Sequence, residues 1–304
     1  MVDYRNISVD GVTFRALRLR ARTTLLRWHV GTTDPNLAAK APADAGPSIY
    51  WPAEGRAGVV AVFNGGFKQS AGAGGAMADG FVFSALMKSH MTIALDNAGH
   101  WSMGLWGTPN FPPAGFHAIS YRQNLGALVW RAKLTPAARS ANWGIWGSPL
   151  GNIPKEARSG LGVDAQGNLV YVATMEPILA APLGLALMRA GVVTGMELDI
   201  NPFWPIMGAS FAPVRAKGGH FPVQLPRGMH SPNIYDSGWE RDFFVALAEP
   251  ANWSCQWQSP GLTGLRGRIQ PQVLALVGTG CGAVGAPITT TTSTSTTSTT
   301  TSAG

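Results

Sequence analysis

Charged side chains, long apolar runs and cysteines are all scarce in this sequence. Asp, Glu, Lys and Arg make up only 13% of the residues, against 45% hydrophobic residues, which describes a well-packed globular body with a lightly charged surface. No apolar run reaches the length that crosses a bilayer. Residues 1–8 lack the charged and apolar regions of a signal peptide. We therefore expect a cytosolic chain, or one whose targeting segment lies outside this sequence.

Metal-ligand spacings and nucleic-acid motifs are missing as well. The six histidines show no spacing typical of metal ligands, so the sequence predicts no metal and no cofactor. The net charge is +7, but the basic residues are scattered and form no nucleic-acid-binding arm. An anionic ligand or an anionic cell surface is the partner that this charge favours. Cys255 and Cys281, the only cysteines, predict a disulfide in an exported protein and two inert thiols in a cytosolic one.

Glycine (38 residues), proline (22) and tryptophan (11) are abundant, and this composition indicates many turns. It is more typical of a strand-rich exported protein than of a helical bundle. We predict an α+β fold with strand-rich mixed or antiparallel sheets and a few flanking helices, in one large domain over residues 1–250. Residues 251–287 are expected to form an extension that holds both cysteines. The Thr/Ser-rich residues 288–304 are too polar to pack, which predicts a disordered tail.

The apolar and turn patterns place the main elements. Residues 59–63 are an uninterrupted apolar run and predict a fully buried strand. Residues 179–190, rich in Leu, Ala and Met and followed by Gly191, predict a helix. The proline- and glycine-rich stretch 203–231 is expected to be a long loop. Further strands are predicted at 12–19, 24–30, 91–95, 100–105, 159–163, 168–174, 192–200 and 242–247.

The end of the buried strand at 59–63 is the first candidate for a site. Asn64 offers a carboxamide donor and acceptor where the strand stops. Gly65 and Gly66 allow a tight turn and let a ligand approach the backbone. A buried strand that simply leaves through a glycine turn explains the same residues without any ligand.

Two carboxylates near the end of the strand at 192–200 are the second candidate. In a regular strand Glu197 and Asp199 share one face, while Met196, Leu198 and Ile200 occupy the other. Such a pair suits general acid–base chemistry, and it also suits a structural salt bridge. Arg158, at the start of the second hairpin, has the planar fork that binds phosphate or carboxylate, although an arginine at this position is often only a surface residue.

The predicted loop that follows carries three more candidates. Trp204 offers an indole face on which a sugar ring can stack. His230 and Asp236 lie late in the loop, where they could line the rim of a site; a lone loop histidine is otherwise usually solvated.

The order of these segments resembles the phosphodiester glycosidase family over about residues 10–248. Ala61 to Phe67 is similar to the family's Asn-Gly-Gly-Phe-Phe motif, and Asp79-Gly80 follows a glycine-rich loop as in the family. Arg158 to Asp164 is similar to the family's Arg-Thr-Ala-Ile-Gly hairpin. The helix at 179–190 leads into a strand that ends at Leu198-Asp199, and Arg241 precedes a closing apolar strand.

The resemblance implies an exported hydrolase that cleaves a sugar-1-phosphodiester between the anomeric carbon and the phosphate. It implies that Asp199 and Glu197 are catalytic. Arg158, Asn64, Gly65 and Gly66 would bind the phosphate.

Two alternatives stay open. Where the family has Asp-Gly-Gly-Gly-Ser-Ser, this chain has Asp199 followed by Ile200-Asn201-Pro202-Phe203-Trp204. This bulky substitution favours, as one alternative, a catalytically inactive exported module that binds an anionic cell-envelope glycan. The other is a structural extracellular domain in which Asn64, Arg158 and Asp199 share no cavity.

Overall fold

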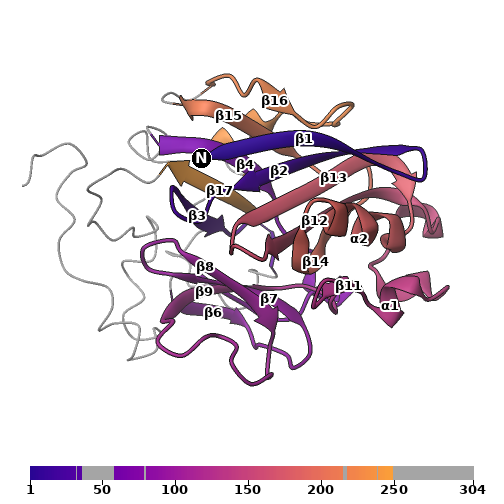
Figure 1. The fold of residues 1–304 in the computed structure, drawn as a ribbon, viewed down its shortest axis with the longest axis horizontal. Helices are drawn as coiled ribbons and strands as arrows, with labels where there is room; N and C mark the ends of the chain where they lie inside the picture. The colour runs from indigo at the N-terminus through magenta and orange to yellow at the C-terminus, as the bar shows by residue number, and fades with distance from the viewer. Residues whose placement is uncertain (32, 36–57, 79, 215–217, 238, 249–304) are drawn as a thin grey trace, which may run out of the picture.

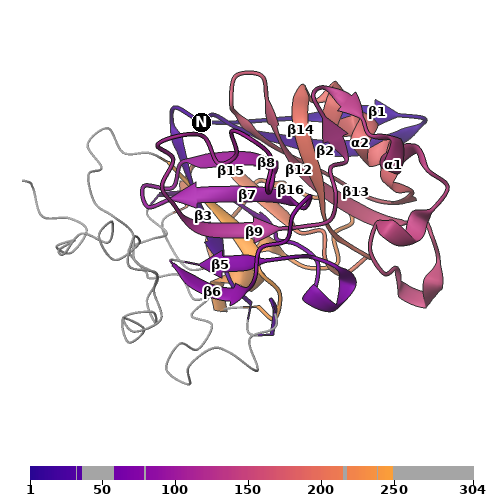
Figure 2. The same cartoon turned by 90° about the horizontal axis from the view of Figure 1, so that it is seen from below.

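The chain folds around three β-sheets in which every strand pairing is antiparallel. In this computed structural model, residues 1–31, 33–35, 58–78, 80–214, 218–237 and 239–248 are described. Asp79, both cysteines, and the predicted extension and tail lie outside these residues. Figures 1 and 2 show the sheets meeting around a common centre.

The largest sheet has seven strands and carries both α-helices on one side (Figure 1). In spatial order its strands are β1 (Val2–Val9), β2 (Val12–Leu19), β13 (Leu169–Ile178), β12 (Glu156–Asp164), β14 (Val192–Ile200), β10 (Val129–Trp130) and β11 (Lys133–Leu134). The helices are α1 (Pro136–Arg139) and α2 (Ala180–Arg189). Helix α2 packs its buried leucines and alanines on this sheet, in what we call the helix-side core.

The other two sheets have five strands each. The second sheet runs β16 (Val223–Gln224), β15 (Met207–Val214), β4 (Val59–Asn64), β17 (Phe243–Ala248) and β3 (Thr24–His29). The third runs β6 (Phe81–Ser84), β5 (Ala76–Ala78), β9 (Ala118–Gln123), β7 (Met91–Asp96) and β8 (Trp101–Leu105). Short 3₁₀ turns occur at η3 (Gln69–Ala71), η4 (Trp143–Ile145), η5 (Leu150–Asn152) and η6 (Pro232–Ser237).

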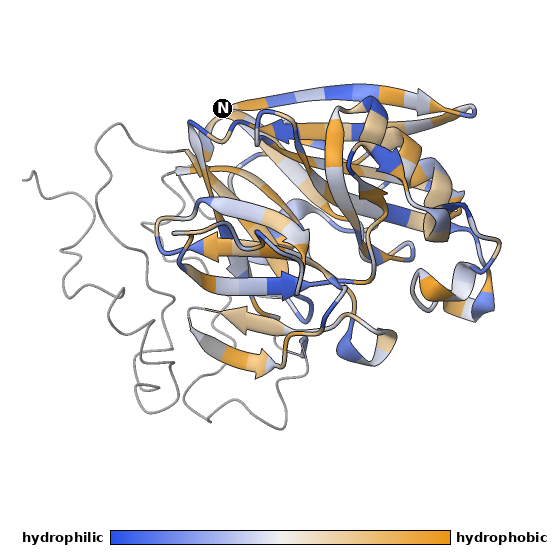
Figure 3. Ribbon diagram, turned by 60° about the horizontal axis from the view of Figure 1, so that its bottom comes forward, coloured by the Kyte–Doolittle hydropathy of each residue, from blue (hydrophilic) through white to orange (hydrophobic). Residues whose placement is uncertain are grey.

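One hydrophobic core joins all three sheets, and we call it the central core. It includes Leu161 and Met196 from the first sheet, Phe63 and Phe244 from the second, and Ile93 from the third. Figure 3 shows hydrophobic residues along the central strands, whereas β1, next to the labelled N-terminus, carries a run of exposed residues over positions 3–6, which suits a strand at the edge of its sheet. The predicted α+β, strand-rich fold is confirmed.

The predicted elements that frame the site are confirmed, with one correction. Strand β4 is buried throughout, α2 spans 180–189 and β14 spans 192–200. The expectation of a loop over all of 203–231 is wrong, because β15 (Met207–Val214) and β16 lie within it. The small residues of β15 have weak strand preference, but its pairing with β4 covers an edge that would otherwise leave buried backbone groups unpaired.

Candidate functional site

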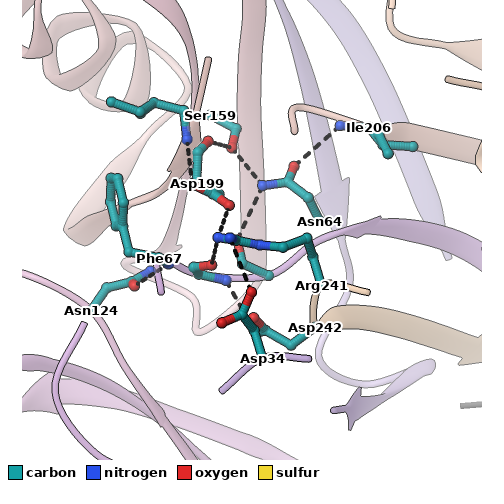
Figure 4. Close-up of polar contacts among 12 residues, drawn as sticks. Asp34, Asn64, Phe67, Asn124, Ser159, Asp199, Ile206, Arg241 and Asp242 are labelled. Atoms are coloured by element: carbon teal, nitrogen blue, oxygen red, sulfur yellow. Dashed lines mark hydrogen bonds and ion pairs between the residues drawn. The ribbon is translucent and has the colours of Figure 1, made fainter. Parts of the chain in front are cut away.

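Three segments far apart in the sequence meet at the ends of β4, β12 and β14. The Asn64 Nδ2 group donates to Ser159 Oγ at 2.9 Å, and that hydroxyl donates to the Asp199 carbonyl at 3.0 Å. The Asp199 amide donates to the Gly65 carbonyl at 3.1 Å. Figure 4 shows these contacts in one view. The structure thus brings the Asn64 turn, the neighbour of Arg158 and the end of β14 into direct contact.

Asn64 uses both ends of its carboxamide inside this junction. Its Oδ1 accepts from the Tyr171 hydroxyl at 2.7 Å and from the Ile206 amide at 3.3 Å, while Nδ2 also donates to the Gly65 carbonyl. The side chain is buried. Burial also raises the pKa of Tyr171, so its hydroxyl keeps the proton that it donates to Asn64. Asn64 therefore connects β4 to β13 through hydrogen bonds. Its predicted contact with phosphate stays a prediction.

Gly65 and Gly66 are needed because other groups occupy the space of a side chain. A Cβ on Gly65 would lie 2.0 Å from Asp242 Oδ2, and one on Gly66 would lie 2.4 Å from Asn124 Oδ1. The Gly65 amide donates to the Asp242 carbonyl at 2.8 Å, and the Gly66 amide donates to Asp242 Oδ2 at 3.1 Å. The sequence predicted that a ligand could approach the backbone at these glycines. In the structure the groups that approach them are the side chains of Asp242 and Asn124.

Gly65→Ala is accordingly expected to lower the free energy of unfolding by about 1–3 kcal/mol, because the new methyl group overpacks a buried network. Gly126→Ala is the matched control, since nothing lies within 4 Å of a Cβ built there. Urea unfolding monitored by tryptophan fluorescence measures both. Equal midpoints for the two variants would contradict the packing described here.

Asp242 and Arg122 form a fully buried ion pair behind the glycines. Arg122 Nε and Nη2 donate to the two carboxylate oxygens at 2.8 and 2.9 Å, and Trp28 Nε1 donates to the same carboxylate at 2.8 Å. Arg122 also donates to the Phe67 carbonyl at 2.7 Å. This pair connects β3, β9 and β17 from two different sheets. Sequence reasoning missed it, although an arginine within the buried end of a strand is the signal that could have found it.

A second buried pair joins Arg158 to Glu197. Arg158 Nη1 lies 2.5 Å from Glu197 Oε1, and the guanidinium also donates to the carbonyls of Ile178, Trp146 and Pro154. Burial raises the pKa of Glu197 to about 7, although Arg158 opposes the shift. A phosphate bound by Arg158 would have to compete with these four partners.

The third pair includes the residue that the sequence marks most strongly. Asp199 Oδ2 accepts from Arg241 Nη2, and Asp199 Oδ1 accepts from the Ile200 amide at 3.0 Å. Arg241 Nη1 lies 3.0 Å from Asp34 Oδ2, so one guanidinium bridges two carboxylates (Figure 4). Burial raises the pKa of Asp199 to about 7 against the opposing charge of Arg241. Burial raises the pKa of Asp34 as well. Asp34 was not predicted, because it belongs to a proline-containing connection with no local pattern.

These three pairs differ in their access to water. The side chains of Asp199, Arg241 and Asp34 retain 5–7% exposure, whereas both side chains of the other two pairs retain 0–1%. Of these three buried groups, the Asp34–Arg241–Asp199 cluster is therefore the most exposed to water.

A bulge separates the two carboxylates of β14. Gly160 of β12 pairs with Glu197, but Arg158 pairs with Ile200, so one extra residue lies on β14 between these positions. Ile200 consequently packs in the helix-side core, whereas Met196 and Leu198 pack in the central core. The expectation that these three share a face is wrong, because the extra residue reverses the alternation. Glu197 and Asp199 therefore meet different arginines.

Aromatic side chains surround the Arg241 side of the cluster. The Trp204 ring lies against the Arg241 guanidinium, with Cζ 4.9 Å from the ring centroid. The Phe203 ring centroid lies 6.2 Å from that of Trp204, and the His230 ring lies between Phe203 and Trp239 at 6.5 and 5.1 Å. Trp204 is half-buried and Phe203 is exposed. Trp204 thus contacts the cluster itself, and His230 belongs to the aromatic row beyond it.

Asp236 lies on η6 and secures the loop that contains His230. Its Oδ2 accepts from the Gly218 amide at 2.7 Å and from Asn233 Nδ2 at 3.3 Å. The structure therefore places Asp236 in contact with its own loop. Its predicted role at the rim of a site stays a prediction.

No family model matches the chain, and no curated protein matches it in sequence. In structure it is similar to the catalytic domain of zebrafish N-acetylglucosamine-1-phosphodiester alpha-N-acetylglucosaminidase, in a form auto-inhibited by its pro-peptide. The two share 12% sequence identity with a TM-score of 0.48, and the match covers 82% of this chain and 83% of that one. A hypothetical protein from Synechocystis has 11% identity and a TM-score of 0.46, with 82% and 62% covered. A predicted exported protein from Burkholderia pseudomallei has 13% identity and a TM-score of 0.41, with 78% and 74% covered.

Proposed function

We propose that this protein hydrolyses a sugar-1-phosphodiester by breaking the bond between the anomeric carbon and the phosphate oxygen. The observation that carries the proposal is the Asp199–Arg241 pair, a carboxylate and a phosphate-binding guanidinium held together at the least shielded end of the buried network. The ordered motifs around Asn64, Arg158 and Asp199, which resemble those of phosphodiester glycosidases, support the same chemistry. A net charge of +7 suits an anionic substrate.

In this proposal Arg241 binds the phosphate. Its planar fork matches two phosphate oxygens. It is held by Asp34, Asp199 and the Gly66 carbonyl, and a phosphate can replace the Asp34 carboxylate while Asp199 stays beside the sugar. Arg158 then acts by holding Glu197 and the end of β12 in place. This changes the role expected from the sequence, because Arg158 is engaged by Glu197 and three backbone carbonyls in an almost fully buried position, whereas Arg241 adjoins the half-buried Trp204.

Asp199 supplies the carboxylate that acts on the sugar, either as the nucleophile at the anomeric carbon or as the base that activates water. The departing phosphate monoester is stable as an anion, so it needs little protonation. Trp204 offers the apolar surface on which the sugar ring can stack. Attack forms a new bond from the anomeric carbon to either the Asp199 carboxylate or a water oxygen whose proton Asp199 takes, and it breaks the bond to the phosphate oxygen, which leaves with the electron pair. If Asp199 is the nucleophile, water then cleaves the glycosyl ester and releases the free sugar.

An ionised Asp199 is required in either role, which predicts a pH dependence. Because the pKa of Asp199 is raised to about 7, the fraction of ionised carboxylate rises about tenfold from pH 6 to pH 8. We expect kcat/KM for a synthetic sugar-1-phosphodiester to rise by a similar factor over this range. Burial raises the pKa of Glu197 to about 7 as well, so the Glu197→Gln variant is the control. If kcat/KM of this variant rises with pH in the same way, the titrating group is Asp199. A profile that stays level from pH 5 to pH 8 would exclude an ionised Asp199 as the acting group.

A second candidate function is binding of an anionic cell-envelope glycan without hydrolysis. Two observations favour it: Trp204 covers the Arg241 guanidinium, and Pro202 and Phe203 replace the small residues that the family has at this point. For either function we propose an exported protein, as the resemblance implies. Retention on purified wall glycan, with no sugar released from a panel of phosphodiesters, would favour binding over hydrolysis.

The Trp204→Ala variant tests whether Trp204 stacks on the sugar or blocks the site. For the hydrolase, loss of the stacking surface is expected to raise KM by up to about tenfold, because aromatic stacking contributes roughly 0.5–1.5 kcal/mol. Phe211→Ala, which removes an exposed aromatic side chain from β15, is the control. A variant that hydrolyses faster than the native protein would instead show that Trp204 blocks the site.

A further inference from the structure

We propose that residues 131–155, which we call the basic projection, dock this protein on the surface of an anionic lipid bilayer. The projection begins with β11 at the edge of the largest sheet and continues through α1, η4 and η5, which protrude from the margin of the molecule beside α2 in both Figure 1 and Figure 2. This inference does not depend on the proposed hydrolase activity.

Three aliphatic side chains are exposed at the tip of the projection. Ile145, Leu150 and Ile153 are 42%, 48% and 58% exposed, and they fall within nine residues: Ile145 ends η4, Leu150 begins η5, and Ile153 follows η5. Trp143, beside them, is half-buried. Clustered exposed aliphatic residues on a protruding segment mark an interaction surface, and a tryptophan at its border suits the interface between water and lipid.

The charge of the projection identifies which partner it fits. Arg131, Lys133, Arg139 and Lys155 are all exposed, and residues 131–155 contain no aspartate or glutamate. Basic residues that border an apolar tip are drawn to anionic headgroups while the tip enters the acyl region. A neutral protein partner would require no such excess of positive charge. An anionic bilayer satisfies both features.

The base of the projection is fixed to the candidate site. Arg158 donates to the carbonyls of Trp146 and Pro154, and the Leu150 amide donates to Asn201 Oδ1 at 2.9 Å. Gly147 packs against Phe67, the residue that follows the Asn-Gly-Gly turn. The exposed aliphatic side chains therefore stand on a backbone that is itself anchored to the candidate site, and docking would bring the neighbourhood of Arg158 and Asn201 close to the lipid surface.

Vesicle co-sedimentation of the full chain tests the inference. We expect sedimentation with vesicles of equal phosphatidylglycerol and phosphatidylcholine, and little with phosphatidylcholine alone. The triple variant Ile145→Ser/Leu150→Ser/Ile153→Ser should weaken binding about tenfold or more, because three apolar side chains no longer leave water. The double variant Arg139→Gln/Lys155→Gln should bind more weakly and with a smaller dependence on salt. Phe211→Ser, at a 57% exposed position on β15, is the control and should bind like the native protein.

Three results would overturn the inference. The first is failure of the native chain to sediment with the anionic vesicles at low salt. The second is equal binding by the native chain and a triple variant whose near-ultraviolet circular dichroism shows a native fold. The third concerns the oligomeric state in size-exclusion chromatography. If the native chain elutes as a dimer, and the triple variant elutes as a monomer that still binds lipid equally well, the exposed aliphatic side chains would be assigned to contact with a second copy of this chain.

Discussion

Asp199→Asn is expected to lower kcat/KM for release of free sugar from a synthetic sugar-1-phosphodiester by roughly 10²–10⁴-fold. The asparagine keeps the size of the side chain and can still accept from the Ile200 amide, but it cannot act as a nucleophile or a base. Arg241 retains its pair with Asp34, so the guanidinium does not become an isolated buried charge. The loss should therefore appear in turnover, with the melting temperature close to that of the native protein.

Asp164→Asn is the matched control for this experiment. Asp164 is buried to the same degree as Asp199, but it lies in the turn between β12 and β13 and accepts from the amides of Gln166 and Asn168. Its activity should remain near the native value. Undiminished turnover in Asp199→Asn would remove Asp199 from the mechanism, whatever the behaviour of the control.

The largest effect on stability is expected for Asp242→Asn. Removing this charge leaves the Arg122 guanidinium buried without its ionic partner, and breaking one side of a buried ion pair costs about 3–5 kcal/mol. Trp28 and the Gly66 amide lose their charged acceptor as well. We expect a clear fall in the urea midpoint with an unchanged m-value, because the native fold is weakened and not expanded.

Asp3→Asn provides the comparison for this variant. Asp3 pairs with Arg20 on the surface, where both side chains are at least half exposed, so its loss should change the midpoint little. Should Asp242→Asn unfold at the same urea concentration as Asp3→Asn, the pair with Arg122 would not be the junction of sheets that we describe.

The elements that frame the site were predictable because their patterns are local. An unbroken apolar run gave β4 with its Asn-Gly-Gly end, and the Leu/Ala-rich run before Gly191 gave α2. The strand at 192–200 was predicted with both ends correct. In each case neighbouring residues specify the conformation, so no knowledge of distant contacts is needed.

The ion pairs were not predictable in the same way, because their members are brought together only by the fold. Arg122 and Asp242 are 120 residues apart, and Asp34, five residues after the end of β3, meets Arg241 from more than 200 residues away in the sequence. The bulge in β14 depends on how β12 pairs with it, so alternation within one strand could not reveal it. For the same reason the sequence favoured Arg158 as the phosphate ligand, whereas we propose Arg241 for this role.

Hydrolysis of a sugar-1-phosphodiester in ¹⁸O-labelled water tests the central claim most directly. If the carboxylate of Asp199 acts at the anomeric carbon, mass spectrometry will find the label in the hydroxyl group of the released sugar and none in the phosphate monoester. Label in the phosphate would show attack at phosphorus and would contradict the account.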